Sequence, residues 1–293
     1  MRVFVYGTGT MGKGIALTSA QAGFEVLFCN DSFPDEVLPA INKIRSDVDK
    51  LQAKGKIALD EAEDLLKRIR PSTDIADCRQ ADFIVETIIE DVRVKHDVFR
   101  KIEAHAAPEA VLASNTTSCS ITEIATGLLH PERVIGFHFF NPATTMKLVE
   151  IMPSLFTDDA VIEKAKGIAL QLGKEPVVTK KEAPAGITSR ILAGLLNEAV
   201  WVYHEGVAEA DDIDKAIVLG CNHRIGPLAL IDMIGVDIHL AKTRMLFEKT
   251  GDARYRPCYL LDQMVTAGFL GRKSGRGFYD YSGEKPVPMR FSR

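Results

Sequence analysis

A histidine and a glutamate on two successive strand-like runs are the residues best suited to move a proton. His138 lies near the end of the run 134–140, and Glu150 lies in the next run, 146–152. Histidine suits a general base because its reference pKa, about 6.5, lies near neutral pH. If the two strands pair, the Glu150 carboxylate can meet the imidazole, orient it and stabilise its cation. The residue types alone also fit a histidine satisfied within the core and a solvated glutamate.

A glycine-rich turn near the N-terminus has the spacing of a dinucleotide-binding loop. Residues 7–12, Gly-Thr-Gly-Thr-Met-Gly, fit G-x-G-x-x-G between a strand-like run and a helix. Glycine lets the backbone turn tightly and approach a pyrophosphate, and the helix N-terminus offers free N–H groups to the phosphates. The alternative is a turn whose glycines serve packing alone. The residues expected to contact the cofactor are Gly7, Gly9, Thr10, Met11 and Gly12.

The end of the second expected strand bears on the choice between NAD and NADP. Asn30 and Asp31 stand where an acidic residue commonly binds the adenosine ribose. Asparagine can hydrogen-bond a ribose hydroxyl, but it does not repel a 2′-phosphate as a carboxylate does. No arginine lies beside Asn30 to pair with that phosphate. We therefore favour NAD as the cofactor.

A third polar segment, Ser114-Asn115-Thr116-Thr117-Ser118, also follows a strand-like run. Its short hydroxyl and amide side chains could bind a substrate oxygen. They could equally satisfy backbone groups of a turn or a helix cap.

The elements that must position these residues alternate between strand and helix. Strand-like runs cover 2–6, 25–29, 81–87, 111–114, 134–140, 146–152 and 176–179, and helical patterns cover 11–22, 92–105 and 158–172. Such alternation predicts a parallel sheet covered on both faces. Residues 35–70 interrupt it as a charged helical hairpin, in which Asp60-x-x-Glu63 resembles a capping box and Pro71 follows the end.

The pattern becomes mostly helical after about residue 181. Helices are expected over 187–205, 211–219 and 237–249, and the run 278–281 is β-like. We place the domain boundary between residues 182 and 183. The expected architecture is α/β: a Rossmann-type, doubly wound parallel sheet with an inserted helical hairpin (1–182), followed by an all-α C-terminal domain (183–293).

Composition limits the possible partners. The chain has 293 residues, of which 46% are hydrophobic, and this is ordinary for a globular protein. Its net charge of −4 argues against nucleic-acid binding through the overall electrostatic field of the protein. No apolar run reaches the roughly 18 residues of a membrane helix, and no secretory leader is recognisable, so we expect a cytoplasmic protein. The five cysteines include no C-x-x-C pair, so we expect reduced thiols and no metal site.

Several of these segments belong together in one known family. The chain resembles the L-3-hydroxyacyl-CoA dehydrogenases over nearly all of its length, and among them the bacterial 3-hydroxybutyryl-CoA dehydrogenases. The resemblance is carried by residues 7–16, 86–91, 114–118, 138–142, 146–150, 226–228 and 270–279.

The resemblance implies a mechanism. His138 takes the hydroxyl proton while C3 of the substrate gives a hydride to the nicotinamide, and Glu150 is the partner of the imidazole. Thr117 falls where the family usually has a serine that bonds the substrate oxygen, so the hydroxyl is retained. Glu90 and Lys95 match positions near the nicotinamide and its ribose.

The resemblance also implies further contacts and a partner. Lys54 matches a lysine that meets the phosphate end of CoA, although a surface lysine is the alternative. Ser189 replaces the usual asparagine that holds the substrate carbonyl, and the shorter side chain needs a bridging water. Asn115 is assigned to the cofactor and Asn141 to the substrate. The family forms homodimers through its second domain, which we expect here too.

The leading hypothesis is therefore an NAD-dependent dehydrogenase of short-chain (S)-3-hydroxyacyl-CoA, in particular 3-hydroxybutyryl-CoA. A relative that acts on a dicarboxylic 3-hydroxyacyl-CoA or on a sugar acid is the first alternative. A non-catalytic, nucleotide-binding structural protein is the second. Acyl-chain length and physiological direction are left open.

Overall fold

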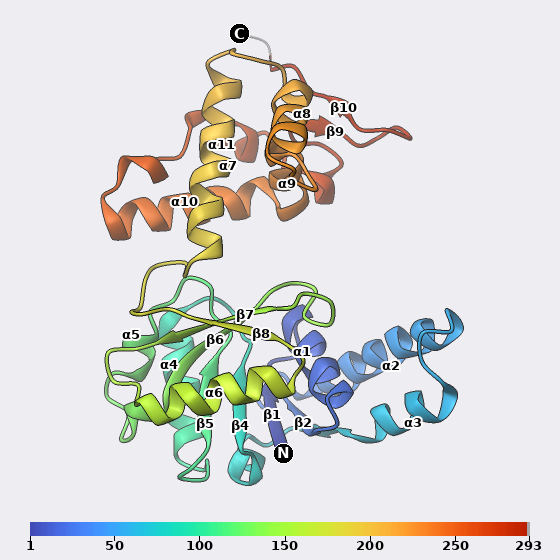
Figure 1. Ribbon diagram of the computed structural model, residues 1–293, viewed down its shortest axis with the longest axis vertical. Coiled ribbons are helices and arrows are strands. Elements are labelled where there is room, and N and C mark those ends of the chain that lie inside the picture. Colours follow the sequence, from blue (N-terminus) through green and yellow to red (C-terminus); the bar gives the residue numbers. More distant parts are fainter. Residues whose placement is uncertain (292–293) are drawn as a thin grey trace. The chain divides into compact units, whose positions relative to one another are not determined.

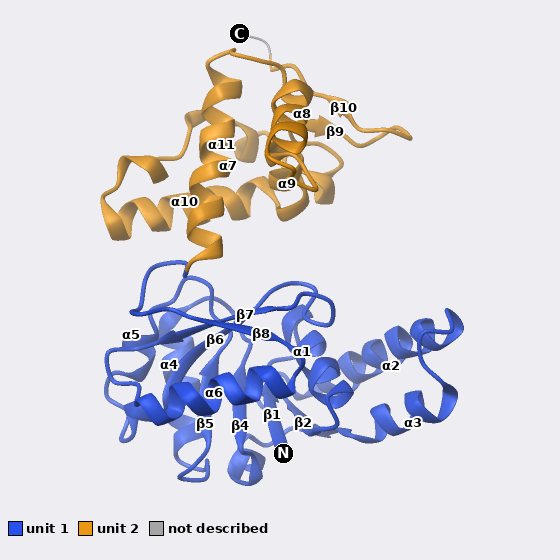
Figure 2. Cartoon of the chain, viewed as in Figure 1, with its two compact units in different colours: residues 1–186 blue, residues 187–293 orange. Residues whose placement is uncertain are grey.

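The computed structural model describes residues 1–291 and divides into two compact units, residues 1–186 and the chain from residue 187 onward (Figure 2). The boundary expected after residue 182 lies just before this division. The first unit contains the sheet, and the second is built mainly of helices.

The sheet of the first unit has eight strands in the order β3-β2-β1-β4-β5-β6-β7-β8. Their bounds are β1 Arg2–Tyr6, β2 Glu25–Cys29, β3 Ile69–Ser72, β4 Phe83–Glu86, β5 Val111–Ser114, β6 Val134–Phe139, β7 Leu148–Pro153 and β8 Glu175–Val178. The first six strands are mutually parallel, but β7 pairs antiparallel with β6, and β8 runs parallel to β7. The expectation of a wholly parallel sheet was therefore wrong at this edge. The cause is the short connection 140–147, because a parallel return needs a crossover of about a dozen residues.

Helices cover both faces of the sheet, as predicted (Figure 1). They are α1 Thr10–Gln21, α2 Val37–Ala53, α3 Leu59–Lys67, α4 Val92–Glu103, α5 Ile121–Ala125 and α6 Asp159–Gln171. Side chains alternate along β1, so that Val3 and Val5 join the core beneath α1, α2, α3 and α6. Phe4 and Tyr6 join the core beneath α4 and α5. This alternation is what permits one strand to support two layers of helices.

The helical hairpin between β2 and β3 was predicted, but one of its details was wrong. The N-cap of α3 is Ala58, and Asp60 lies within the first turn, so residues 60–63 do not form a capping box. Pro71 follows the end of α3, as predicted, and lies in β3, a strand that was not expected from the sequence. A proline is tolerated there since β3 is the edge strand of the sheet.

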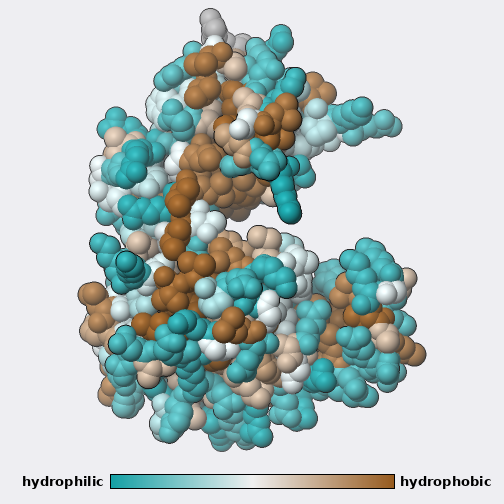
Figure 3. Space-filling view, viewed as in Figure 1, coloured by the Kyte–Doolittle hydropathy of each residue, from teal (hydrophilic) through white to brown (hydrophobic). Residues whose placement is uncertain are grey.

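The second unit packs five helices around one core: α7 Thr188–His204, α8 Ala210–Gly220, α9 Pro227–Ile234, α10 Val236–Thr250 and α11 Tyr259–Thr266. A short antiparallel pair, β9 Tyr279–Asp280 and β10 Val287–Pro288, departs from the expected all-α domain. Short 3₁₀ turns complete the chain: η1 Pro34–Glu36, η2 Ile75–Gln80, η3 Pro131–Arg133, η4 Ala253–Tyr255 and η5 Arg272–Ser274. Figure 3 shows apolar side chains exposed on this unit. By their exposed fractions, Ile191, Leu219 and Met233 are among the large apolar side chains that this unit exposes.

A buried carboxylate fastens the C-terminal segment of the second unit to its helices. Asp232 in α9 accepts hydrogen bonds from the backbone N–H groups of Phe278 and Tyr279, each at 2.9 Å, and from the Tyr281 hydroxyl at 3.0 Å. Burial raises the pKa of Asp232 to about 6, and these hydrogen bonds oppose the rise. The β9–β10 pair has only two residues in each strand, so the Asp232 carboxylate is a main anchor of this segment.

Two further observations concern the described chain. No helix within residues 1–291 is long and apolar enough to cross a membrane. The five cysteines are free thiols, of which Cys29, Cys78 and Cys258 are buried.

Candidate active site

The glycine loop lies between the carboxyl end of β1 and the N-terminus of α1, and its shape fits a dinucleotide. Gly7 has a φ of 116°, which a side chain would strain. A Cβ on Gly12 would overlap the carbonyl oxygen of Gly7, so this glycine allows the helix to pack closely. A Cβ on Gly9 would meet nothing within 4 Å, so glycine is not required there by the packing of the protein itself. It leaves open space above the helix N-terminus, where a pyrophosphate binds.

A cavity of about 510 Å³ lies beside this loop at the ends of β1, β2 and β4. Asn30 is buried in its wall, where its Nδ2 donates to Thr8 Oγ1 at 3.0 Å and its Oδ1 accepts from the Phe33 N–H at 3.1 Å. Asp31 is not among the described residues that line the cavity, because its carboxylate binds the Tyr6 hydroxyl and Ser32. Of the two residues expected to meet the ribose, only Asn30 therefore faces the cavity.

His138 and Glu150 lie directly opposite each other on the paired strands β6 and β7. His138 Nδ1 is 3.5 Å from Glu150 Oε2, which is an ion-pair distance, and the two side chains are 7% and 1% exposed. On the other side of the ring, Nε2 lies 3.1 Å from Thr117 Oγ1. The three predicted catalytic residues are thus brought together, with the imidazole between a carboxylate and a hydroxyl.

The surroundings hold this group in place. Asn115 Oδ1 accepts a hydrogen bond from the Phe139 N–H at 2.8 Å, which ties the end of β5 to the residue after His138. The ring of Phe140 packs against the imidazole with centroids 4.5 Å apart. Gly186 has a φ of 58°, and a Cβ there would overlap Glu150 Oε2. A glycine at position 186 therefore makes room for the carboxylate.

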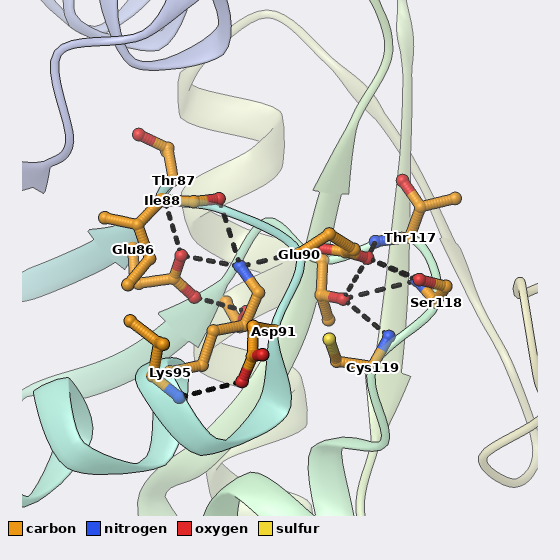
Figure 4. Close-up of polar contacts among 12 residues, drawn as sticks. Glu86, Thr87, Ile88, Glu90, Asp91, Lys95, Thr117, Ser118 and Cys119 are labelled. Carbon is orange, nitrogen blue, oxygen red and sulfur yellow. Dashed lines mark hydrogen bonds and ion pairs between the residues drawn. The ribbon is translucent and has the colours of Figure 1, made fainter. Parts of the chain in front are cut away.

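Glu90 organises the loop that carries Thr117. Its Oε1 accepts hydrogen bonds from Thr116 Oγ1 at 2.6 Å, from the Thr117 N–H at 2.8 Å and from the Ser118 N–H at 2.6 Å (Figure 4). Burial alone would raise the pKa of Glu90, but the charge of Lys95 and these hydrogen bonds outweigh it and lower the pKa. A carboxylate that stays ionised can keep the loop, and with it the Thr117 hydroxyl, in one position.

Behind this loop lies a buried ion pair that the sequence pattern does not predict. Lys95 in α4 places its Nζ 2.7 Å from Glu86 Oε1 and 3.5 Å from Glu90 Oε2, and Figure 4 shows its amino group between the two carboxylates. Glu86 also accepts hydrogen bonds from Ser114 Oγ at 2.7 Å and from the Ile88 N–H at 2.6 Å. Burial raises the pKa of Glu86, and these contacts oppose the rise. The side chains of Lys95 and Glu86 are 1% and 0% exposed, so the pair joins β4, β5 and α4 beneath the site.

The remaining predicted residues make none of the contacts described above. Thr10 and Met11 begin α1, and Lys54 is exposed at the end of α2. Asn141 follows β6 and lines a separate cavity of about 530 Å³ with Lys13 and Lys43. Ser189 is buried in α7 of the second unit. Within residues 1–291, no group of three or more His, Cys, Asp or Glu side chains could hold a metal ion.

Two family models match the chain. One is the NAD-binding domain of 3-hydroxyacyl-CoA dehydrogenase, which covers residues 2–183, and the other is the C-terminal domain of the same enzymes, which covers residues 187–281. Together they account for nearly the whole of both units.

Individual proteins agree with this result. A 3-hydroxybutyryl-CoA dehydrogenase from Bradyrhizobium diazoefficiens is 42% identical over 99% of this chain and 98% of its own. A probable 3-hydroxybutyryl-CoA dehydrogenase from Bacillus subtilis is 40% identical over 96% and 97%. The crystal structure of (S)-3-hydroxybutyryl-CoA dehydrogenase from Ralstonia eutropha superposes with a TM-score of 0.92, at 39% identity, over 96% of this chain and 99% of that one.

Proposed function

Because this chain belongs to the 3-hydroxyacyl-CoA dehydrogenase family, we propose that it interconverts (S)-3-hydroxybutyryl-CoA and acetoacetyl-CoA with NAD as its cofactor. NAD, when bound, supplies a nicotinamide carbon that takes or returns a hydride. The open space at Gly9 and the cavity beside it fit the pyrophosphate and adenosine of that cofactor. The observation that carries the proposal is the position of His138 between Glu150 and Thr117.

His138 is the general base of the proposed oxidation. Its Nε2 accepts the proton of the substrate hydroxyl as the hydride leaves C3, so that a carbonyl forms, and it returns the proton in the reverse reaction. Thr117 Oγ1, 3.1 Å from Nε2, is placed to hydrogen-bond the same substrate oxygen. Both groups must contact that oxygen at once, which their separation permits.

Glu150 is the residue that stabilises the imidazolium. The ring gains a positive charge when it takes the proton, and a carboxylate 3.5 Å from Nδ1 favours this state more than the neutral one. The carboxylate also holds the ring so that Nε2, and not Nδ1, faces Thr117. Since Glu150 is almost completely buried, water screens this interaction little.

The other predicted residues act by binding and positioning. Glu90 holds the Thr117 loop, and Asn115 holds the end of β6 beside His138. Lys95, with its Nζ 3.5 Å from Glu90 Oε2, stabilises the negative charge of Glu90. We assign Asn141, Lys54 and Ser189 to the acyl-CoA substrate on the family resemblance alone.

Two expectations about the whole protein stay predictions. The family resemblance and the exposed apolar side chains of the second unit support a homodimer. A cytoplasmic location was expected from the sequence.

The purified protein should oxidise NADH when acetoacetyl-CoA is added, and the product should be (S)-3-hydroxybutyryl-CoA. Parallel assays with a longer 3-oxoacyl-CoA and with a dicarboxylic 3-oxoacyl-CoA test the acyl chain, and the four-carbon substrate should give the highest kcat/KM. A folded protein that binds NADH but turns over none of these thioesters would overturn the proposal.

A further inference from the structure

The cavity beside the glycine loop contains one formally charged side chain among the described residues that line it, and this is Glu36. Glu36 ends the η1 turn, six positions beyond Asn30. Its Oε2 accepts a hydrogen bond from Thr8 Oγ1 at 2.9 Å. The same Thr8 oxygen accepts from Asn30 Nδ2 at 3.0 Å, so a continuous chain of hydrogen bonds runs from the end of β2 to Glu36.

We propose that Glu36 binds the adenosine ribose and selects NAD over NADP. In dinucleotide-binding folds, the residue that reads the ribose 2′ position is commonly an acid near the end of the second strand. Here Asn30 occupies that place, and both ends of its amide are engaged by Thr8 and Phe33. Asp31 is engaged by Tyr6 and lies 3.8 Å from Lys101. The carboxylate that reaches the cavity therefore comes from the next turn of the chain.

The position of Glu36 suits a ribose for a second reason. Thr8 belongs to the glycine loop, so its partner Glu36 lies one side chain away from the space for the pyrophosphate. Phe33, just before η1, is 62% exposed and lines the same cavity as the apolar residues Ile88 and Val94. A flat aromatic side chain beside aliphatic ones can cover an adenine ring. The ribose then lies between the adenine and the glycine loop, where Glu36 is.

The charge of Glu36 explains the selection. An ionised carboxylate accepts hydrogen bonds from the ribose hydroxyls, and such charge-assisted bonds are stronger than neutral ones. A 2′-phosphate in the same place adds negative charge next to that carboxylate, and none of the described lining residues is a lysine or an arginine. We therefore expect Glu36 to favour NADH and to disfavour NADPH at the same time.

The test is to measure the dissociation constants of NADH and NADPH by nicotinamide fluorescence, without any acyl-CoA. The wild-type protein should bind NADH at least tenfold more tightly than NADPH. Glu36→Gln should weaken NADH binding several-fold and tighten NADPH binding, so that the preference falls at least about tenfold. Glu36→Arg should reverse the preference, because a guanidinium can pair with the 2′-phosphate.

Asp35→Asn is the matched control, because it removes the same charge from an exposed neighbour that does not line the cavity. It should leave the preference within twofold of the wild-type value. The proposal is overturned if the wild-type protein shows no preference, or if folded Glu36→Gln and Glu36→Arg proteins both keep the wild-type preference. The inference rests on NAD binding and not on the proposed substrate. Since the assay needs no turnover, failure of the acyl-CoA proposal would leave this result intact.

Discussion

Replacing Glu150 by glutamine should slow the reaction by removing a charge while keeping the shape of the side chain. The carboxylate lies 3.5 Å from His138 Nδ1, and the pair is almost completely buried. At an effective dielectric constant of about 20, the attraction between a carboxylate and an imidazolium at this separation is about 5 kcal/mol. The transition state carries only part of the positive charge, so we expect a loss of about 3–4 kcal/mol. This corresponds to a decrease in kcat/KM of roughly 10²–10³-fold.

The assay is the reduction of acetoacetyl-CoA by NADH under steady-state conditions, with the NADH dissociation constant measured separately by fluorescence. The decrease should fall mainly on kcat, because Glu150 acts through His138 on the charge that develops in the transition state. NADH binding should change by less than threefold. The variant should remain folded, since glutamine can occupy the same space opposite His138.

Glu175→Gln is the control for charge removal near this edge of the sheet. Glu175 lies on β8, the strand that pairs with β7, but it is exposed and opposite Leu148. It should keep the wild-type rate. If Glu150→Gln stays within tenfold of the wild-type kcat/KM, Glu150 does not stabilise an imidazolium, and the assigned role is wrong.

Three further predictions concern stability and support of the site. Lys95→Met leaves Glu86 buried without its cation, so urea unfolding should show that the free energy of unfolding falls by about 3–5 kcal/mol. Adding Glu86→Gln to this variant should restore part of the lost stability. A Lys95→Met protein as stable as the wild type would contradict this prediction. Gly186→Ala should lower kcat at least tenfold with little change in NADH binding, because the new Cβ would displace the Glu150 carboxylate; an unchanged kcat would refute that contact. Burial raises the pKa of Asp232 to about 6, above the value near 4 of an unfolded chain, so the folded state binds this proton more tightly and its contribution to stability grows as pH falls from 7 to 4. Asp232→Asn should remove this contribution, so that between pH 7 and pH 5 the Tm of the variant rises less, or falls more, than that of the wild type. An identical change in Tm in both proteins would disprove the link.

The site could be predicted in part because its groups follow strand ends. The pattern around residues 138 and 150 indicated two strands, and the structure places His138 and Glu150 opposite each other. The direction of β7 was missed, although the predicted strands left a gap of only a few residues. A gap so short cannot hold a crossover helix, so the antiparallel pairing could have been inferred.

The buried ion pair beneath the site could not be derived so directly. Lys95 was expected near the cofactor from the family resemblance, and nothing indicated Glu86 as its partner. One local signal was present, because Lys95 shares a helix face with the buried residues Val98, Phe99 and Ile102. A lysine on an apolar helix face needs a buried counter-charge, but the sequence alone does not show which acid supplies it.

The cofactor cavity shows a different limit on what can be predicted from the sequence. Asn30 and Asp31 were the expected ribose ligands because the acid that binds the ribose commonly lies at the end of the second strand. Whether a side chain faces the ligand depends on its competing partners, and here Tyr6 and Thr8 engage these two residues. Glu36 lines the cavity because the η1 turn brings it next to the glycine loop, where its carboxylate accepts a hydrogen bond from Thr8. This placement cannot be derived from the sequence alone.

The central claim is that His138 transfers the substrate proton, and one comparison tests it most directly. His138→Asn should be assayed for acetoacetyl-CoA reduction together with its affinity for NADH. We predict a decrease in kcat/KM of about 10²–10⁴-fold, as for the loss of a general acid–base, with NADH affinity within threefold of the wild-type value. A folded variant that binds NADH and retains more than a tenth of the wild-type kcat/KM would contradict the claim.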